Sequence, residues 1–422
     1  PSGEYVTHFG PGQLSTADGI ELAQGGNVIY VTDEDAENSR VTKWSTLVPD
    51  PITNPASGIT QTVATLNASI NPSGYATTYQ FEYGKTTAYG TSVPIPAKEI
   101  GSGGAPVSVS QSISGLTTGT TYHFRVAATN KEGTVAGGDL TFTTGIAPPT
   151  YQSAFGSSGS GNGQFKVMTN IAVDPADQSL WVTDDENDRL QHFSSAGAYL
   201  GQFKTCYDPA AVAVKSASAI YVACASGQQI QKYNSSGQSL KQLASWGSGN
   251  GQVVFPLDLT FDAQGDLWVA DTENDRVQEF DSEDKFSKAI SLGAWSRPWS
   301  VDVTQTGKIW VAEPNHSRVS AFDQAGKVLL RFGTYGTGAG QFNRPTDVEV
   351  DANGFLWVTD AVNDRVQVFN ETGGYITQFG QSGAGAGQIE TDWWLRVALG
   401  ANGVVWLTDQ GNSRVQRWQI GS

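Results

Sequence analysis

Three acidic side chains and one hydroxyl occupy the same place in different copies of a repeated segment. They are Glu21, Asp302, Glu349 and Thr260. Carboxylate and hydroxyl oxygens are the ligands that a hard cation such as calcium prefers. Carboxylates that converge in a narrow space must otherwise take up protons or recruit a counter-ion. We therefore predict a calcium site at these four residues, with a merely water-filled channel as the alternative.

A second polar set lies two positions earlier in the same copies and includes Asn170, Asp258, Asp347 and Arg396. We expect these residues at the rim of the channel, where Arg396 offsets part of the negative charge. We recognise no non-repeated set of acid, base and nucleophile in the sequence, so no catalytic residue is predicted.

The histidines and the cysteines narrow the possible chemistry further. The four histidines, at positions 8, 123, 192 and 316, fall on unrelated elements, which argues against a three-histidine zinc site. Cys206 precedes the inner strand of one blade, and Cys224 ends the second strand of the same blade. Both therefore lie at the same rim, within disulfide reach. We predict a disulfide, and hence an exported protein, over the alternative of two buried thiols.

The repeated segment positions all these residues. An aromatic residue opens the same short phrase at Tyr30, Trp181, Tyr221, Trp268, Trp310, Trp357 and Trp406, and from Trp181 onward these anchors are 40 to 49 residues apart. Each copy alternates apolar and polar residues over about four short strands, as in residues 345–380. Such a period is typical of the blades of a β-propeller, an all-β fold.

The chain ends indicate how the propeller closes. Residues 3–10 have the pattern of an outer strand, and the last copy, residues 394–418, has only three strands. We predict a seven-bladed propeller whose N-terminal strand completes the last blade and removes an exposed edge. Six blades are the alternative, if the degenerate copy around Tyr221 is not a full blade. In blade one, residues 40–44 are the predicted third strand and residues 151–156 the fourth.

A separate domain interrupts blade one. The predicted division is 1–49 and 147–422 for the propeller and 50–146 for the insert. The insert has alternating strand patterns at residues 64–70, 77–83, 107–113, 121–129 and 139–143. The segment 114–130 resembles the later strands of a fibronectin type III domain. The resemblance implies an immunoglobulin-like sandwich in which Leu116 and Tyr122 form the tyrosine corner.

The blades resemble NHL repeats. The resemblance rests on Asn274-Asp275-Arg276-Val277-Gln278, Asn363-Asp364-Arg365-Val366-Gln367 and their counterparts at 38, 187, 315 and 412. It implies a propeller, whereas family members include protein-binding, RNA-binding and lyase domains. The metal-binding histidines of the lyases are missing here. Because the Asp-x-x-Asn-x-Arg set recurs in nearly every blade, we interpret it as a turn-stabilising structure. The glycine-rich phrases, such as residues 332–342, are interpreted as connections between blades.

The composition of the chain restricts the partners that it can bind. The chain has 41 acidic and 25 basic residues, and residues 50–146 carry 5 and 4 of them, so the propeller holds a net charge of −15 out of −16. Nucleic acids and anionic membranes are poor partners for such a surface. No transmembrane run is present, and the start at Pro1 suggests a processed chain or one whose signal peptide is not shown.

Three functions are compatible with these features. The leading hypothesis is an extracellular or cell-surface binding or structural scaffold that works through protein contacts, with self-assembly included. A calcium-assisted hydrolase or lactonase, similar to the gluconolactonase-like propellers, is the second. A carbohydrate-binding protein that uses the rim aromatics Trp295, Trp299, Trp393 and Trp394 is the third.

Overall fold

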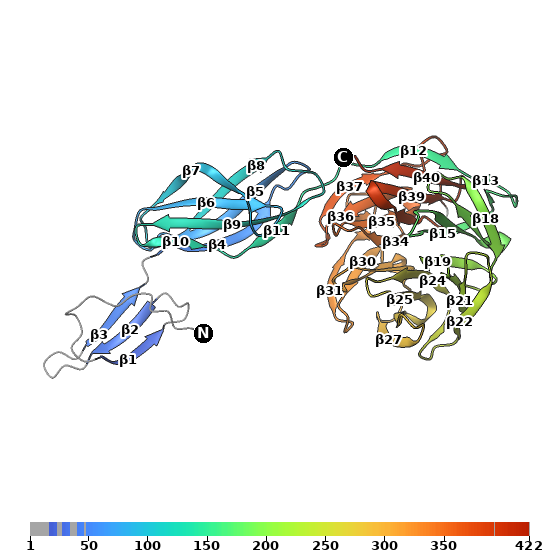
Figure 1. The fold of residues 1–422 in the computed structure, drawn as a ribbon, viewed down its shortest axis with the longest axis horizontal. Helices are drawn as coiled ribbons and strands as arrows, with labels where there is room; N and C mark the ends of the chain where they lie inside the picture. The colour runs from blue at the N-terminus through green and yellow to red at the C-terminus, as the bar shows by residue number, and fades with distance from the viewer. Residues whose placement is uncertain (1–16, 23–27, 34–39, 46–47, 392, 422) are drawn as a thin grey trace. The chain divides into compact units, whose positions relative to one another are not determined.

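The structure, a computed structural model, describes residues 17–22, 28–33, 40–45, 48–391 and 393–421. The chain divides into two compact units, Pro1–Thr144 and Gly145–Ser422. Both units are built from β-strands (Figure 1). The short helical segments of the described residues are 3-10 turns at Asp185–Asn187, Thr272–Asn274, Pro314–His316, Ala361–Asn363 and Ala401–Gly403. None of them is long and apolar enough to cross a membrane.

The first unit begins with a three-stranded antiparallel sheet of β1 (Ala17–Leu22), β2 (Val28–Asp33) and β3 (Arg40–Ser45), in that order. The register places Glu21 opposite Tyr30 and Asp33 opposite Arg40. The third strand predicted for blade one is therefore present. The predicted closing strand at residues 3–10 lies outside the described residues.

A sandwich of two sheets follows in the same unit. One sheet has the order β4-β5-β8 and the other β10-β9-β6-β7, with β11 paired to β9. The strands are β4 (Asp50–Ser57), β5 (Val63–Asn71), β6 (Thr77–Gly84), β7 (Thr91–Gly101), β8 (Val107–Ser114), β9 (Thr121–Asn130), β10 (Gly133–Ala136) and β11 (Leu140–Thr143). Alternate residues of β5, such as Leu66 and Ile70, are buried with Phe81 and Phe124 in one core. All five predicted strands of this region are confirmed.

Two of the strands missed in the sandwich contain prolines. Pro51 and Pro55 lie in β4, and Pro94 and Pro96 lie in β7. Proline lacks the N–H that a central strand needs, so it argues against a strand in the sequence. Both strands lie at the edge of their sheets, where a missing donor is tolerated. The predicted tyrosine contact is present as well: the backbone N–H of Thr117 donates to the hydroxyl of Tyr122 at 3.0 Å, and Leu116 is buried.

Within its described residues, the second unit contains six sheets built on four antiparallel strands each; one of them is extended by a fifth, parallel strand, β23 (Gln252–Val253), and two further sheets have two short strands each. From the inner to the outer strand, the first three are β15 (Met168–Val173), β16 (Leu180–Asp184), β17 (Arg189–Phe193), β18 (Tyr199–Lys204); β19 (Pro209–Ser216), β20 (Ala219–Cys224), β21 (Gln229–Tyr233), β22 (Ser239–Trp246); and β24 (Pro256–Phe261), β25 (Leu267–Asp271), β26 (Arg276–Phe280), β27 (Phe286–Ser291). The others are β28 (Ser300–Val303), β29 (Ile309–Glu313), β30 (Arg318–Phe322), β31 (Val328–Phe332); β34 (Pro345–Val350), β35 (Leu356–Asp360), β36 (Arg365–Phe369), β37 (Tyr375–Phe379); and β38 (Val397–Leu399), β39 (Val404–Asp409), β40 (Arg414–Gln419), β12 (Thr150–Phe155).

The six sheets form a ring that closes within the second unit. The inner strands contact one another in the order β15, β19, β24, β28, β34 and β38, and β38 contacts β15. The outer strand of the last sheet is β12, which pairs with β40 through Tyr151 opposite Trp418 and Phe155 opposite Val415. Figure 1 shows green β12 beside red β40. The first and last parts of the unit are thus joined by backbone hydrogen bonds.

This pairing corrects one prediction. Residues 151–156 are not the outer strand of blade one, since β12 belongs to the sheet of β38, β39 and β40. Without β12, β40 would present a row of unpaired N–H and C=O groups. The copy around Tyr221 is a full sheet, contrary to the reason given for the alternative of six blades. The remaining predicted copy, around Tyr30, lies in the first unit.

The recurring aromatic residue fills the space between neighbouring sheets. Trp268 of β25 is buried in one cluster with Val301 and Ile309, which belong to the next sheet. Trp310 of β29 packs in the same way with Val348 of β34. The repeat period is therefore the spacing at which each sheet places one large side chain against its neighbour.

The Asp-x-x-Asn-x-Arg set stabilises the connection between sheets, as the sequence indicates. The Asp360 carboxylate accepts hydrogen bonds from Asn363 at 2.8 Å and from Arg365 at 2.8 Å. Arg365 also donates to the carbonyls of Gly338 and Gln341 in the glycine-rich phrase. Within these phrases lie the short strands β13 (Ser157–Ser158), β14 (Gln164–Phe165), β23 (Gln252–Val253), β32 (Thr334–Tyr335) and β33 (Gln341–Phe342).

Candidate functional site

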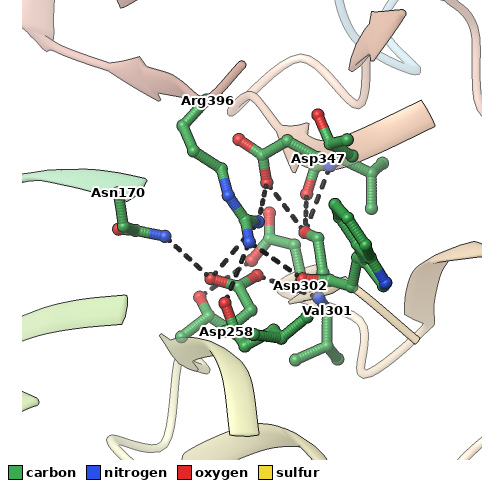
Figure 2. A network of polar contacts seen from close by, with 12 residues as sticks. Asn170, Asp258, Val301, Asp302, Asp347 and Arg396 are labelled. Carbon is green, nitrogen blue, oxygen red and sulfur yellow. Dashed lines mark hydrogen bonds and ion pairs between the residues drawn. The ribbon is translucent and has the colours of Figure 1, made fainter. Parts of the chain in front are cut away.

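The inner strands bring the predicted rim residues together at the centre of the ring. Asn170 comes from β15, Asp258 from β24 and Asp347 from β34, while Arg396 immediately precedes β38. Figure 2 shows the Arg396 guanidinium pointing toward Asp258 and Asp347, and the Asn170 side chain pointing toward Asp258. The amide of Asn170 donates to Asp258 at 3.2 Å. All four predicted rim residues thus belong to one polar network.

Arg396 ties four inner strands to one another. Its guanidinium donates to Asp347 at 3.3 Å and lies 3.9 Å from Asp258. It also donates to three backbone carbonyls, those of Leu257 at 2.9 Å, Trp299 at 3.1 Å and Thr169 at 3.2 Å. The Arg396 side chain is fully buried, so these acceptors replace water around its charge.

The three aspartates each hold the next sheet of the ring. One carboxylate oxygen of each accepts a backbone N–H from the following inner strand: Asp258 from Val301 at 3.0 Å, Asp302 from Val350 at 2.7 Å and Asp347 from Val397 at 2.8 Å. Asp302 accepts in addition the hydroxyl of Thr260 at 3.0 Å, and Asp347 that of Ser300 at 2.8 Å. These carboxylates therefore act first as bridges between neighbouring sheets.

Burial dominates the acidity of these carboxyls. It raises the pKa of Asp258 to about 6, although the nearby Arg396 guanidinium lowers it. It raises the pKa of Asp302 to about 7 against the hydrogen bonds from Val350 and Val303, which lower it. It also raises the pKa of Asp347, with Arg396 again opposing. The network thus holds carboxyl groups that titrate close to neutral pH.

Glu349 differs from the aspartates because its carboxylate has no hydrogen-bond or ion-pair partner among the described residues. Burial raises its pKa well above the usual range, and the charges of Asp302 and Asp347 raise it further. Glu349 lines a cavity of about 260 Å³ together with Asp258 and Asp347, and the lining continues to Val173 and Leu399 at the ends of the inner strands. The cavity therefore carries one carboxylate that the fold itself does not use.

The residues predicted as calcium ligands are only partly brought together. Thr260, Asp302 and Glu349 belong to the ring, and Thr260 bonds to Asp302. Glu21 lies in β1 of the first unit, which is described separately from the ring. In the described part of the chain, the carboxylates whose ligand atoms lie within 4.8 Å of one another are instead Asp262, Asp266 and Glu279. Glu279 in that group is paired with Lys288 at 2.9 Å.

The cysteines form the predicted bond, and the described histidines each have a partner of their own. Cys206 and Cys224 form a disulfide with their Cα atoms 6.0 Å apart. Cys224 ends β20, at the position where the other second strands carry the turn-stabilising acid. The described histidines have separate partners: His123 bonds to Asp139, His192 to Ser179, and His316 lies 3.5 Å from Glu313.

The four rim tryptophans divide into two kinds. Trp299 and Trp394 are half-buried and stacked on each other, with ring centroids 4.9 Å apart. Trp295 and Trp393 are 74% and 52% exposed. The guanidinium of Arg344 lies 3.7 Å from the ring centre of Trp393. The sequence identified these tryptophans but not Arg344, whose only signal is an arginine next to an inner strand.

Comparison with known families identifies the repeat. The model for the NHL repeat matches residues 254–280 and 342–369. These two segments are similar to NHL repeats. The matched segments include β25 and β26, and β35 and β36, with the turn-stabilising acid and arginine between them. A search of curated proteins found no match.

Solved structures give neighbours at low identity. A protein of unknown function from Bacteroides thetaiotaomicron is 14% identical, with a TM-score of 0.53, and covers 88% of this chain and 98% of its own. A gluconolactonase from Xanthomonas campestris is 15% identical (TM-score 0.49, 65% of this chain and 98% of its own). A streptogramin B lyase is 12% identical (TM-score 0.46, 71% of this chain and 90% of its own). The repeats and the first of these neighbours are consistent with a β-propeller-like all-β fold.

Proposed function

We propose that this chain is a binding or structural scaffold that acts through protein contacts, rather than an enzyme. The supporting observation is that its three central aspartates are already engaged in hydrogen bonds within the fold. Asp258, Asp302 and Asp347 each accept a backbone N–H from the next inner strand, and Arg396 spans the space between them. A general base or nucleophile must be free to meet a substrate. These three aspartates are used to hold the ring together, which favours the surface as the functional part.

The proposed architecture follows from the same contacts. The six-sheet ring of Gly145–Ser422 is a complete six-bladed propeller, because its inner strands close on themselves. The sandwich is a fibronectin type III-like domain, supported by its three- and four-stranded sheets and the bond between Thr117 and Tyr122. It joins a blade-like sheet, β1 to β3, to the propeller along the chain. Such a domain supplies a further surface for protein contacts.

We place the protein outside the cell or at the cell surface. The disulfide between Cys206 and Cys224 supports this, because disulfides persist in oxidising compartments. The net charge of −16 supports protein partners that are neutral or basic, and argues against nucleic acids.

The experiment that tests the scaffold role is the mass of the native particle, measured by light scattering after size exclusion. We expect an assembly larger than the 44.8 kDa chain. A strict monomer that hydrolyses lactones or esters would contradict the proposal. A screen of such substrates on the same sample is therefore the matched measurement.

Glu349 favours one second candidate, a cation such as calcium in the cavity. Its carboxylate lacks a partner in the described residues and lies near three aspartates that repel it. Calcium would offset this repulsion, and the Glu349 carboxylate would supply it with an oxygen ligand that the fold leaves free. The calcium-assisted lactonase would use the same site.

Melting curves with and without calcium test this candidate. We expect calcium to raise the melting temperature of the native protein and to leave that of Glu349→Gln unchanged. A matched control is Glu371→Gln, which alters an exposed acid away from the centre. An equal calcium response in all three proteins would exclude Glu349 as a ligand.

A further inference from the structure

Arg344 occupies a position that the fold does not reserve for arginine. It precedes Pro345 at the start of β34, with a left-handed φ of 66°, and its carbonyl accepts the N–H of Ala361 at 3.1 Å. The same left-handed conformation before a proline recurs at Asp208, Phe255 and Arg297. Since acidic, aromatic and basic residues share this backbone geometry, the repeat requires the conformation and not the guanidinium.

The Arg344 guanidinium is held against indole rings. It lies 3.7 Å from the ring centre of Trp393 and 5.5 Å from that of Trp299. Trp299 in turn stacks on Trp394. Cation–π contacts of this kind fix the plane of a guanidinium while its N–H edge stays available. The group is therefore preorganised before any ligand arrives.

The N–H donors of Arg344 remain unused in the described part of the chain. Its side chain makes no hydrogen bond or ion pair there, whereas Arg297, at the equivalent position, is bonded to Glu273. Burial lowers the pKa of Arg344, with no acid among the described residues compensating the loss of water. A guanidinium carries five N–H donors in a fork that matches a carboxylate.

We propose that Arg344, Trp393 and Trp299 form a binding site for a carboxylated sugar, that is, a uronic acid unit of a glycan. The carboxylate accepts two N–H groups from Arg344, and the apolar face of the sugar ring packs on the exposed indole of Trp393. This inference goes beyond the proposed scaffold role, which concerns protein partners, and it does not depend on it.

Charge and shape select this ligand over the alternatives. Residues 145–422 carry 29 acidic and 19 basic side chains, a net charge of −10, so a polymer with a carboxylate on every unit is repelled far more strongly than a glycan with a single uronic acid. An acidic peptide side chain supplies the carboxylate but no ring. The guanidinium lies over one face of the Trp393 ring, and the 52% exposure of Trp393 leaves apolar surface that a sugar ring covers.

Titration with three small probes tests the site in the full chain. The probes are glucuronate, glucose as the uncharged ring, and acetate as the carboxylate without a ring, followed through the indole N–H signals in NMR spectra. We expect glucuronate to bind about tenfold more tightly than either of the others, because only it engages both Arg344 and Trp393.

Two site variants and one charge-matched control complete the test. Arg344→Gln and Trp393→Ala should each weaken glucuronate binding about tenfold. Arg331→Gln, which removes an exposed arginine on β31, should leave it unchanged. Melting curves verify that all three variants are folded. Because Arg344 is not required by the backbone geometry, Arg344→Gln should melt like the native protein.

Several outcomes would overturn the proposal. Acetate binding as tightly as glucuronate would indicate a simple anion site. Equal binding of an acetylated, amidated Gly-Glu-Gly peptide would indicate an acidic protein segment instead. Undiminished glucuronate binding in folded Arg344→Gln, or no saturable binding at all, would exclude the site. None of these results bears on the oligomeric mass, so the scaffold role stands or falls separately.

Discussion

At the scale of single residues, Arg396 is the side chain on which most of the centre depends. Its removal in Arg396→Ala leaves Asp258 and Asp347 without their cation and three carbonyls without their donor. We expect a loss of about 3 to 5 kcal/mol in the free energy of unfolding, the cost of an uncompensated buried charge. Urea unfolding of the native and variant proteins measures it.

A compensating change makes the Arg396 prediction specific. Adding Asp347→Asn to Arg396→Ala removes one stranded negative charge, and part of the lost stability should return. Arg331→Ala, on the exposed outer strand, should change stability by no more than about 0.5 kcal/mol. If both arginine variants lose the same amount, the central network is not what stabilises the ring.

Glu349 gives a prediction about pH. Its pKa is raised in the folded state, so folding favours its protonated form. Between its unfolded and folded pKa values the folded protein binds more protons, and stability falls as pH rises. The contribution is fully present below the unfolded pKa and is lost as pH rises through the folded pKa. Asp302, with a folded pKa of about 7, adds to the same loss between about pH 4 and about pH 7.

The Glu349→Gln variant isolates this effect. Glutamine has the same shape and no charge to lose, and the carboxylate it replaces has no described hydrogen bond. We expect the variant to gain stability relative to the native protein as the pH is raised from mildly acidic to neutral, in buffer without divalent cations. Chemical denaturation at several pH values measures this, and parallel curves for the two proteins would contradict it.

The sequence predicts the location of these residues better than their partners. Alignment of the copies was enough to place Asn170, Asp258, Asp347 and Arg396 around one centre, because the repeat period defines the inward position. It did not indicate that each carboxylate bonds to the next strand, since such contacts join residues more than 40 positions apart. The role of ligand assigned to Asp302 came from its residue type and its inward position, neither of which shows the hydrogen-bond donors of the carboxylate.

At the scale of elements, the second sheet of the ring is stabilised by a disulfide in place of the ion pair found in the other sheets. The other sheets join their second and third strands through an acid and an arginine, as at Asp184 and Arg189. In the sheet of β19 to β22, Cys224 takes the position of the acid. It is bonded to Cys206, which precedes β19 and lies 18 residues earlier in the chain. A covalent link stabilises mainly by restricting the unfolded chain.

We expect the double variant Cys206→Ala with Cys224→Ala to lose about 3 kcal/mol of stability, as for a loop of this size. Reduction of the native protein should produce a similar loss, while reductant should not affect the double variant. Urea unfolding with and without reductant compares them. A native protein indifferent to reductant would show that the bond does not stabilise the sheet.

The strand β12 shows where sequence reasoning fails for an element. Residues 5–10 and 151–156 both begin with Tyr and end with Phe-Gly, as the outer strand at residues 375–380 does. Alternation identifies a strand and its buried face, but the partner of an edge strand is determined by chain geometry. The need for a strand beside β40 was correctly inferred, whereas its source was assigned to the wrong one of two similar segments.

At the scale of the whole molecule, the ring closes without the first unit. The contact of β38 with β15 and the pairing of β12 with β40 both lie within Gly145–Ser422. Sequence periodicity predicted the type of fold, because every copy repeats the same buried residues. Periodicity could not decide whether the copy at Tyr30 belongs to the ring, since a blade has the same sequence pattern wherever it packs.

This closure leads to a prediction about fragments. The fragment 145–422 retains every inner-strand contact and both sides of the β12–β40 pair, so we expect it to fold cooperatively and to melt at the temperature of the ring in the full chain. The fragment 157–422 lacks β12 and exposes the edge of β40. An open edge of this kind pairs with other chains, so the shorter fragment should melt lower and aggregate. Calorimetry and light scattering of the two fragments test this prediction.

If residues 1–144 supplied a blade of the same ring, fragment 145–422 would behave like the shorter one, because both would then be open rings.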